Sequence, residues 1–385
     1  MSLNQFSLGD VCSIKHGYAF KGQYFSDSIT KEILLTPGNF NIGGGFKKDK
    51  LKYYNGPIDK NYILKPYDLI VTMTDLSKNG DTLGFSALVP EDNNIYLHNQ
   101  RIGLVENINE KIIDKNYLYW LLRNPEYHHY VVSSSTGTTV KHTSPKTILK
   151  YEFELPSIKE QKFISQILTN IELKIELNKK INKNLTKLSS IIFINLMEKS
   201  DEFLELNECC KFIKGKKPKE TSEYPQSNFL DYLTIDVLSN QSQMYAYDEK
   251  GILANEYDIL MVMDGASSGK LFYGKSGLVG STLAKLNVEE KYLEIVYQFL
   301  KQSEKFISDN TTGSAIPHTD KGLVLNLKCP ISEELLNHSD MFKSMRSSII
   351  INNREILKLQ KLRDTLLPKL MSGEIDVSKI NCDLE

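Results

Sequence analysis

The sequence predicts an α+β protein in which two mixed α/β domains are joined by two long helices that pack as a coiled coil. Two features of the 385 residues predict this fold. The first is a degenerate internal repeat, whose copies match in four segments that occur in the same order. The second is a long run in each copy in which apolar residues recur at steps of three and four.

The internal repeat is recognised from segments whose offset falls along the chain. Residues 8–21 recur at an offset of 198, and residues 65–70 recur at an offset of 190. Residues 136–143 recur at an offset of 176, and residues 187–197 recur at an offset of 174. Chance similarity is the alternative. The shared order of the four segments favours one scaffold that is used twice and carries different loops.

The first part of each copy has the pattern of a mixed α/β domain. Short apolar and β-branched runs, such as residues 69–73 and 259–263, are bounded by Gly, Pro, Asn and Asp and predict strands. Residues 116–122 and 292–300 are rich in Tyr and Leu and predict a helix at the same place in each copy.

A long helix is predicted to follow each domain. The first begins after Pro156 with Ser157 and Glu160 at capping-box spacing, and neither Pro nor Gly occurs again before Gly215. The apolar seams comprise Ile164, Leu168, Ile171, Ile175, Leu185, Leu188, Ile192 and Leu196 in the first helix, and Phe342, Met345, Ile349, Ile356, Leu359, Leu362, Leu366 and Leu370 in the second. Packing of an amphipathic helix onto a globular domain is the alternative. A run of about 36 residues, or about 54 Å, is longer than one small domain covers, which favours the coiled coil.

Asn178 and Asn352 occupy equivalent positions in the two seams, 174 residues apart. A polar residue in an apolar seam costs stability and fixes the register of the helices. If the helices pack antiparallel about a pseudo-two-fold axis, residues close to the axis meet their own counterparts. We therefore expect Asn178 and Asn352 to lie close together across the seam.

Composition and charge exclude several classes of protein. Hydrophobic residues make up 41% of the chain, which indicates a globular protein. The 47 Lys and Arg nearly balance the 48 Asp and Glu, so any binding of nucleic acid depends on local basic surface. The five Cys are irregularly spaced, so we expect neither a disulfide framework nor a zinc site. The sequence shows neither a membrane span nor a signal peptide, and we expect a cytoplasmic protein.

No motif supports a catalytic site, and we expect neither a catalytic residue nor a bound metal in this chain. Residues 264–271 are similar to a phosphate-binding loop, but the run is one residue short and Leu271 replaces the Ser or Thr that would hold Mg²⁺. Residues 124–127 lack the second proline of an amino-methyltransferase motif and predict a turn that ends a helix. His142 and His318 recur in two loops that contain Thr-Gly, and we expect them to stabilise the loops or to contact phosphate.

Loops rich in Gly, Lys and small polar residues occur at corresponding places in both copies, and they are the candidate DNA-binding surface. Lys and Arg supply charge for phosphates, Arg pairs with guanine, and Asn or Gln pairs with adenine. An ordinary solvated loop is the alternative for any single residue, whereas the correspondence between copies favours DNA. The candidates are Lys15, His16, Lys21, Lys47, Lys48, Lys78, Asn79, Gln100, Arg101 and Lys141 in the first copy, and Lys214, Lys216, Lys217, Lys219, Ser268, Lys270, Lys275 and His318 in the second.

These features together resemble the specificity subunit of type I restriction-modification systems. The resemblance rests on the two-copy layout, the paired Thr-Gly loops, the entry 155–161 (LPSIKEQ) into the first long helix, and the tail 362–375 (LRDTLLPKLMSGEI). It covers essentially the whole chain. The second copy departs from the family pattern, because Glu333 and Glu334 stand in place of the Glu-Gln pair.

The resemblance implies an architecture for each part of the chain. Two target-recognition domains, 1–156 and 201–332, would be joined by a central spacer helix, 157–200, and a distal spacer helix, 333–376, with a tail at 377–385. The two helices would pack antiparallel with pseudo-two-fold symmetry. Each domain would read one half of a bipartite DNA site.

The resemblance also implies partners. The chain would bind double-stranded DNA and two methyltransferase subunits, and motor-nuclease subunits would join for restriction of phage DNA. The chain itself would be non-catalytic and would bind no cofactor, while S-adenosylmethionine, ATP and Mg²⁺ would act on the partner subunits. A two-headed coiled-coil scaffold for protein partners, a self-sufficient DNA enzyme, and a subunit of a related multi-subunit restriction class are the alternatives.

Overall fold

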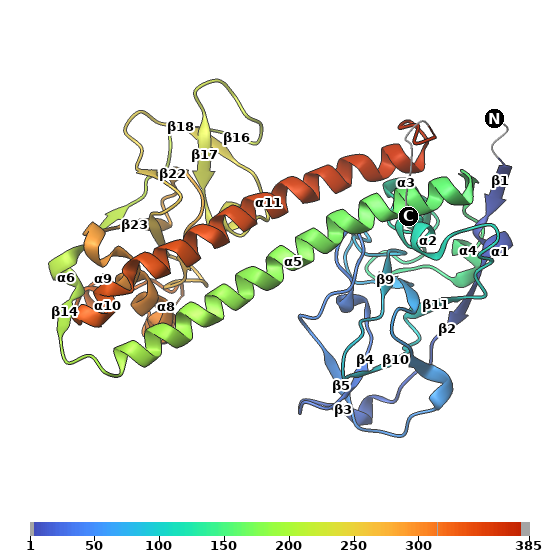
Figure 1. Ribbon diagram of the computed structural model, residues 1–385, viewed down its shortest axis with the longest axis horizontal. Helices are drawn as coiled ribbons and strands as arrows, with labels where there is room; N and C mark the ends of the chain where they lie inside the picture. Colours follow the sequence, from blue (N-terminus) through green and yellow to red (C-terminus); the bar gives the residue numbers. More distant parts are fainter. Residues whose placement is uncertain (1–3, 314, 379–385) are drawn as a thin grey trace. The chain divides into compact units, whose positions relative to one another are not determined.

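The computed structural model describes residues 4–313 and 315–378, and the chain divides into two compact units (Figure 1). Unit 1 comprises Met1–Lys174 and Lys358–Glu385, and unit 2 comprises Ile175–Leu357. Each unit therefore holds one mixed α/β domain and a segment of both long helices. This division differs from the predicted separation of domains and spacer helices, because the helix segments share hydrophobic cores with the domains.

Unit 1 is built on two sheets. The first is antiparallel, in the order β2 (Ser13–His16), β11 (Ile102–Glu106), β7 (Leu69–Thr72) and β9 (Ser86–Leu88). The second has the order β3 (Phe25–Ser26), β5 (Lys52–Tyr54), β4 (Glu32–Leu34), β10 (Ile95–Leu97) and β6 (Ile63–Leu64), in which β4 and β10 are parallel. Two further strand pairs join β1 (Asn4–Ser7) to β13 (Glu152–Leu155) and β8 (Thr74–Asp75) to β12 (Lys141–His142).

Short helices complete unit 1 and cover its first sheet. They are α1 (Leu8–Val11), α2 (Lys115–Leu121), α3 (Pro125–Ser133) and α4 (Pro145–Ile148), with single 3₁₀ turns at Gly22–Tyr24, Pro37–Asn39 and Lys60–Tyr62. Trp120 and Tyr117 of α2 are fully buried in one core with Leu69 of β7 and Val105 of β11.

Unit 2 repeats this plan. Its antiparallel sheet has the order β15 (Cys210–Lys214), β23 (Leu283–Val288), β20 (Ile259–Val262) and β21 (Leu271–Phe272). Its mixed sheet has the order β16 (Glu220–Ser222), β18 (Tyr245–Tyr247), β17 (Leu230–Leu233), β22 (Gly277–Val279) and β19 (Leu253–Ala254). The remaining elements are β14 (Phe203–Glu205), β24 (Lys328–Pro330), α6 (Leu206–Cys209), α7 (Ile235–Leu238), α8 (Leu293–Asp309), α9 (Lys321–Leu325) and a 3₁₀ turn at Glu290–Tyr292.

The matching strand orders confirm the internal repeat and the mixed α/β class. Both sheets of unit 2 repeat the topology of unit 1 strand for strand. The helices differ: α2 and α3 are separated at Asn124 and Pro125, whereas α8 continues as one helix of 17 residues. Proline at the first position of α3 lacks the N–H that would continue α2, and it begins a new helix instead.

The first long helix, α5 (Ile158–Met197), has 40 residues and begins as predicted. The capping box is confirmed, because the backbone N and the Oγ of Ser157 donate to Glu160 Oε2 at 2.8 and 2.7 Å. Gln161 then ties the helix to the domain. Its Oε1 accepts a hydrogen bond from Asp114 N at 2.8 Å, and its Nε2 donates to two backbone carbonyls.

The second long helix differs from the prediction at both ends. A separate helix α10 (Glu333–Asn337) precedes α11 (Ser339–Met371), so residues 333–376 do not form one helix. His338 lies between them, and its Nδ1 bonds to the Glu334 carbonyl at 2.7 Å, which ends α10. Beyond Met371, Gly373 has a φ of +71°, the left-handed conformation that ends many helices. Most of the predicted tail, residues 379–385, lies outside the described residues.

The predicted apolar seam is wrong at one pair of equivalent residues. Leu188 and Leu362 are each 46% exposed, whereas their neighbours Ser189 and Arg363 are largely buried. The other predicted seam residues are buried or partly buried. In α5 the seam positions run 185, 189 and 193, two successive steps of four residues. A regular alternation of three and four would have placed residue 188 in the seam, so the heptad is irregular here.

The polar seam residues of unit 2 show how the two helix segments pair. Asn178 Nδ2 donates to Glu355 Oε2 at 2.7 Å, and Asn352 Nδ2 donates to Asn182 Oδ1 at 2.8 Å. Residue numbers rise along α5 as they fall along α11, so these segments are antiparallel. Asn178 and Asn352 each bond to a polar partner on the other helix and not to one another, which corrects the expected pairing by about one helical turn.

Two further expectations concern the chain as a whole. Within residues 4–313 and 315–378, no helix is both long and apolar enough to cross a membrane. Cys12, Cys209, Cys210 and Cys329 are buried free thiols, and Cys382 lies outside the described part of the chain.

Candidate nucleic-acid interface

In unit 1, four loops meet where the first sheet ends. Met73, which follows β7, donates its N–H to the Arg101 carbonyl at 2.9 Å and accepts from Thr143 N at 3.0 Å. Tyr18, which follows β2, donates to the His98 carbonyl at 2.9 Å. These backbone bonds bring together four of the loops that the sequence singles out in the first copy.

Unit 2 holds its loops by the same bonds. Met263 donates to the Thr282 carbonyl at 2.8 Å and accepts from Thr319 N at 2.8 Å. Lys216 N donates to the Val279 carbonyl at 3.2 Å, in the place of the Tyr18 bond. The two candidate surfaces therefore share one backbone frame, and they differ in the side chains that it carries.

A glycine stands at the point of closest approach in each frame. A Cβ at Gly17 would lie 2.0 Å from the Asn99 carbonyl oxygen, and a Cβ at Gly215 would lie 2.1 Å from the Gly280 carbonyl oxygen. No larger residue fits without moving backbone. Gly17 lets the loop after β2 pack against the turn before β11, and Gly215 lets the loop after β15 pack against the turn before β23.

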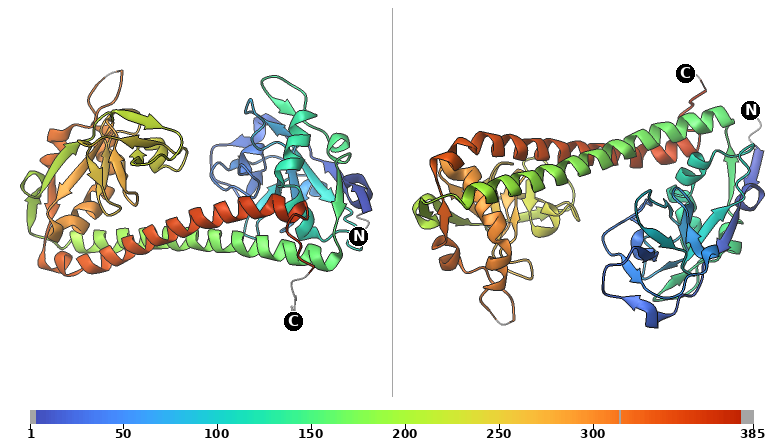
Figure 2. Two further views of the ribbon diagram at one scale, coloured as in Figure 1. Left: turned by 90° about the horizontal axis from the view of Figure 1, so that it is seen from above. Right: turned by 60° about the horizontal axis from the view of Figure 1, so that its bottom comes forward.

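The Thr-Gly loops have the same closed geometry in both units. Thr136 and His142 exchange backbone hydrogen bonds at 2.9 and 2.8 Å, and Thr312 and His318 do so at 2.8 and 2.7 Å. The glycines inside these loops, Gly137 and Gly313, have φ values of +94° and +90° and leave no room for a Cβ. Figure 2 shows the loop of unit 2 projecting from its domain; Ser314 of this loop lies outside the described residues.

A histidine fixes each Thr-Gly loop to the neighbouring strand end. In unit 1, His142 Nδ1 lies 3.2 Å from Thr74 Oγ1. In unit 2, His318 Nδ1 lies 2.7 Å from Asp264 Oδ1. The same loop is thus held by a histidine–threonine pair in one unit and by a histidine–aspartate pair in the other.

Asp264 is the centre of a charged cluster in unit 2. Lys214 Nζ lies 3.4 Å from its other carboxylate oxygen. Partial burial alone would raise the pKa of Asp264, but the hydrogen bond from His318 and the charge of Lys214 outweigh burial and hold this pKa below its ordinary value. The carboxylate therefore stays ionised at neutral pH and keeps both basic side chains in place.

Asp75 orders the loop that carries Lys78 and Asn79. Its carboxylate accepts hydrogen bonds from Ser77 N at 2.6 Å, and from Thr82 N and Oγ1 at 2.5 and 2.6 Å. Burial opposes its ionisation, but these hydrogen bonds outweigh burial and lower the pKa of Asp75. The loop is therefore closed around a buried carboxylate, with Lys78 and Asn79 on its exposed side.

Most of the candidate DNA-binding side chains are exposed. The exposed ones are His16, Lys21, Lys48, Lys78, Asn79, Arg101, Lys214, Lys216, Lys217, Lys219, Lys270 and His318, and the partly buried ones are Lys15, Lys47, Gln100, Lys141 and Lys275. Exposure in the shared frame is what contact with DNA requires.

Besides Lys214 and His318, which contact Asp264, two further candidates of the second copy are occupied within the protein. Ser268 is 3% exposed and its Oγ donates to the Gly265 and Pro317 carbonyls at 2.7 and 2.9 Å, so its hydroxyl stabilises the loop in this structure, which argues against the expected contact with DNA. Lys275 Nζ donates to the Val237 carbonyl at 2.5 Å, and burial lowers its pKa. The sequence of a Gly-rich loop does not show whether a serine or lysine in it bonds to the loop itself or faces solvent.

Three lysines of the first copy also have partners in the protein. Lys47 Nζ lies 3.6 Å from Asp49, and Lys48 Nζ lies 2.8 Å from Asp92. Lys15 Nζ donates to the Asn61 carbonyl at 2.9 Å and lies over the ring of Tyr62. Lys47 and Lys48 belong to the loop before β5 rather than to the frame around Met73.

Among the described residues, no group of three or more His, Cys, Asp and Glu side chains could hold a metal ion. The run 264–271 forms a loop closed by the Ser268 hydrogen bonds. Lys270 lies 4.9 Å from the ring of Phe272.

Comparison with known families shows which family the chain belongs to. The family model described as "Type I restriction modification DNA specificity domain" matches the chain twice, over residues 2–187 and 198–361, which is most of its length. The chain belongs to this family. The two matches coincide with the two copies of the repeat, and they confirm the resemblance that the sequence motifs indicate.

Individual relatives are named as type I restriction enzyme specificity subunits. The MjaVIII specificity subunit of Methanocaldococcus jannaschii is 32% identical over 177 residues, which cover 44% of this chain and 42% of the relative. The EcoBI specificity subunit of Escherichia coli is 30% identical over 167 residues, covering 43% and 32%. The MjaIX specificity subunit of M. jannaschii is 24% identical over 310 residues, covering 69% and 70%. The aligned part of the chain spans less than half the length of the first two relatives.

A solved structure shares the fold. The crystal structure of the type I restriction-modification S subunit from M. genitalium matches with a TM-score of 0.65 at 15% identity, over 96% of both chains. This likeness confirms the fold class of a specificity subunit: two mixed α/β domains with long helices.

Each specificity domain is anchored to its helix segments by an ion pair that sequence reasoning missed, partly buried in unit 1 and fully buried in unit 2. In unit 1, Arg123 Nη2 lies 3.6 Å from Glu172 Oε2 of α5, and Arg363 Nη1 of α11 lies 2.7 Å from the same oxygen. In unit 2, Arg346 Nη2 of α11 lies 2.5 Å from Glu294 Oε1 of α8. Glu172 and Arg346 are equivalent at the offset of 174, so the charge on the helix is reversed between the units. The sequence signal was a charged residue beside apolar seam positions.

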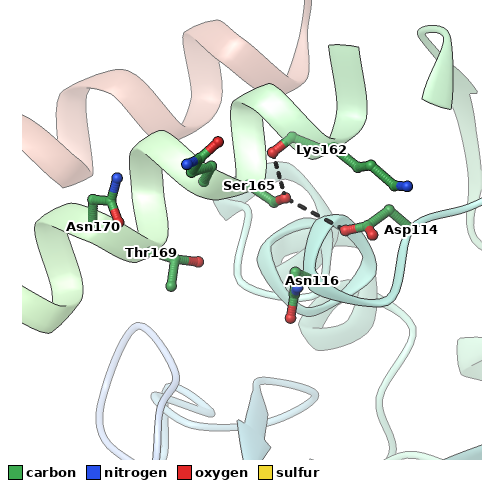
Figure 3. Close-up of a pocket in the computed structure, with 7 residues that line it drawn as sticks. Asp114, Asn116, Lys162, Ser165, Thr169 and Asn170 are labelled. Carbon is green, nitrogen blue, oxygen red and sulfur yellow. Dashed lines mark hydrogen bonds between the residues drawn. The ribbon is translucent and has the colours of Figure 1, made fainter. Parts of the chain in front are cut away.

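A pocket of about 390 Å³, lined by polar and charged residues, lies between α2 and α5 of unit 1 (Figure 3). Its wall consists of Asp114, Asn116, Lys162, Ser165, Gln166, Thr169 and Asn170. Ser165 Oγ donates to the Lys162 carbonyl at 3.0 Å and to Asp114 Oδ1 at 3.4 Å. The bond to Asp114 joins the start of α2 to the first turns of α5.

Proposed function

We propose that the chain is the DNA sequence-specificity subunit of a type I restriction-modification complex, and that each unit reads one half of a bipartite target. The single observation that carries this proposal is one loop frame used twice with different exposed side chains. The same side chains on both frames would read one half-site twice, whereas different side chains read two different half-sites. Family membership and the names of the relatives support the same role.

Reading two half-sites with one chain has a physical advantage. A correct base pair contributes about 1–3 kcal/mol of discrimination, so one small domain is weakly selective among many genomic sites. Joining two domains makes the second contact intramolecular and adds its discrimination to the first. We infer that α5 and α11 set the number of unread base pairs between the half-sites.

Lengthening both helices by one heptad is expected to widen the unread gap by about three base pairs. The insertions follow Lys180 in α5 and Arg354 in α11, so that Asn178 stays opposite Glu355 and Asn182 stays opposite Asn352. A heptad keeps the seam in phase and adds about 10 Å, against about 3.4 Å per base pair. Sequencing of methylated sites in cells that carry the variant measures the gap.

The matched control is the same insertion in α5 alone. It displaces one helix along the other and breaks the seam bonds, so loss of methylation is expected. An unchanged gap in a doubly lengthened and active variant would show that the helices do not set the spacing.

We further propose that the helices bind two methyltransferase subunits. Leu177 and its equivalent Ile351 are 51% and 59% exposed, and Leu188 and its equivalent Leu362 are exposed as well. Large apolar side chains exposed on a long helix indicate a surface that a partner covers. Their occurrence as pairs at the same offset supports one partner surface presented twice.

Leu177→Glu is expected to reduce the number of bound methyltransferase subunits from two to one, because a carboxylate in an apolar interface is left unpaired. Ile351→Glu is expected to do the same, and the double variant is expected to bind none. Light scattering of the purified complex measures the stoichiometry. Asn184→Glu, an exposed polar position on α5, is the control and is expected to retain two.

In this proposal the partner subunits carry out the catalytic steps. The methyltransferase subunits would supply S-adenosylmethionine, motor-nuclease subunits would supply ATP and Mg²⁺ chemistry, and the chain would select the site without catalysing a step. The complex would act in the cytoplasm, where the host chromosome and invading phage DNA are both accessible.

Duplex binding in the presence of the methyltransferase tests this function. Binding that weakens with salt and prefers particular sequences is expected, because the loop lysines displace counterions while the other side chains read base edges. Stable methyltransferase binding without any sequence preference would favour a protein scaffold. Turnover by the isolated chain with S-adenosylmethionine or Mg²⁺ would favour a self-sufficient enzyme.

A further inference from the structure

The position before the central strand of the first sheet differs between the two units. Arg101 precedes β11 and Thr282 precedes β23, and both side chains are exposed. The two positions are equivalent in space, because their carbonyls accept the N–H of Met73 and Met263 at 2.9 and 2.8 Å. One frame therefore presents a guanidinium where the other presents a hydroxyl.

The turn that carries Arg101 is held at several points. Asn99 Oδ1 accepts from Arg101 N at 3.0 Å, and the Asn99 carbonyl accepts from Ile102 N at 2.9 Å. Asn99 is 7% exposed, and Gly17 lies against its carbonyl. The backbone at Arg101 is thus fixed before any ligand binds, so only the side chain must be ordered on binding.

The other basic neighbours of Arg101 in the frame are lysine and histidine side chains, which are suited to phosphate. Lys141 and His142 form β12, which pairs with Thr74 and Asp75 just beyond Met73. Lys78 is exposed on the loop that Asp75 closes. In this group Arg101 is the one arginine, and a guanidinium fork is the side chain that pairs in two places with the O6 and N7 of guanine.

The corresponding loops of unit 2 are richer in lysine. Lys216, Lys217 and Lys219 follow the first strand there, in the place of Tyr18, Ala19 and Lys21. Lysine is a point charge without a fixed fork, so it contributes affinity for phosphates at any sequence.

We propose that Arg101 is a specificity-determining residue that reads a guanine in the half-site of unit 1, and that unit 2 reads no guanine from the equivalent position because Thr282 stands there. This inference rests on the proposed function. It assigns one base pair of one half-site to one side chain.

Selection of bound duplexes from a randomised library, with the chain assembled on its methyltransferase subunits, tests the proposal. Arg101→Ala is expected to lower the preference for one G·C pair by about tenfold or more, in one half-site only. Arg101→Lys is expected to restore affinity but little of the preference. Thr282→Arg is expected to add a G·C preference to the other half-site, and this gain does not depend on how well the alanine variant folds.

Lys216→Ala is the matched control in the frame of unit 2. It is expected to weaken binding at all sequences alike and to reduce the slope of log affinity against log salt by about one. A wild-type complex with no sequence preference would overturn the proposed function. A wild-type preference that Arg101→Ala leaves unchanged at every G·C pair would overturn only the role of Arg101.

Discussion

Arg346→Ala is expected to lower the free energy of unfolding of unit 2 by about 3–5 kcal/mol, because it leaves the Glu294 carboxylate buried without its partner. Both side chains are almost fully buried, at 2% and 3% exposure. Arg346 Nη1 also donates to the Tyr257 carbonyl at 2.8 Å, and its guanidinium lies 5.3 Å from the ring of Tyr297. Urea denaturation of the full chain measures the loss.

Two further variants separate the unpaired charge from a general effect of truncation. Arg354→Ala on the same helix removes an ion pair with Glu256, but the Arg354 side chain is 53% exposed, and a loss below about 1 kcal/mol is expected. Arg346→Met combined with Glu294→Leu is expected to recover most of the stability, because no charge remains buried. Equal losses for Arg346→Ala and Arg354→Ala would contradict this explanation.

Gly17→Ala is expected to destabilise unit 1 by about 1–3 kcal/mol and to weaken DNA binding, since the new Cβ would lie 2.0 Å from the Asn99 carbonyl oxygen. Backbone rather than a flexible side chain must move, and the backbone concerned carries Arg101. Thermal unfolding and duplex affinity of the methyltransferase complex measure the two effects. Gly215→Ala is expected to act in the same way on unit 2.

Gly22→Ala is the control for a glycine in the same region. The nearest atom to its Cβ would be a ring carbon of Phe25 at 3.6 Å, an ordinary contact, so little change in stability is expected. If Gly17→Ala were as stable and as active as Gly22→Ala, the close approach would not hold the frame.

The architecture was predictable because repeats and helical periodicity are properties of sequence patterns. Matching segments in a fixed order predicted two copies of one domain, and the strand orders are indeed the same. The prediction that Leu188 and Leu362 lie in the seam was wrong, because helical spacing alone does not show whether an apolar residue faces the partner helix or solvent. Only the observed packing shows that Ser189 and Arg363 occupy the seam instead.

The candidate surface was predictable as a set of loops, but its internal contacts were not. Strand register places Met73 between the Arg101 turn and the Thr-Gly loop, residues far apart in the chain. The bracing roles of Asp75 and Asp264 depend on that register, and so does the burial of Ser268. The ion pairs between the domains and the helices were not predicted, because arginine and glutamate side chains are usually exposed and their burial cannot be inferred from composition.

The reversed charge at positions 172 and 346 has a consequence for how such genes diversify. Recombination that exchanged the two globular heads within one chain, while leaving the helices behind, would set Arg123 against Arg346 and Glu294 against Glu172. Arg346 would then face a second guanidinium without a carboxylate, whereas Glu172 would keep Arg363, so the junction at Arg346 would be the less stable of the two. A recombinant that keeps both ion pairs must therefore carry each α/β domain together with its own helix segments. The crossover points would then lie inside α5 and α11 and not at the domain boundaries.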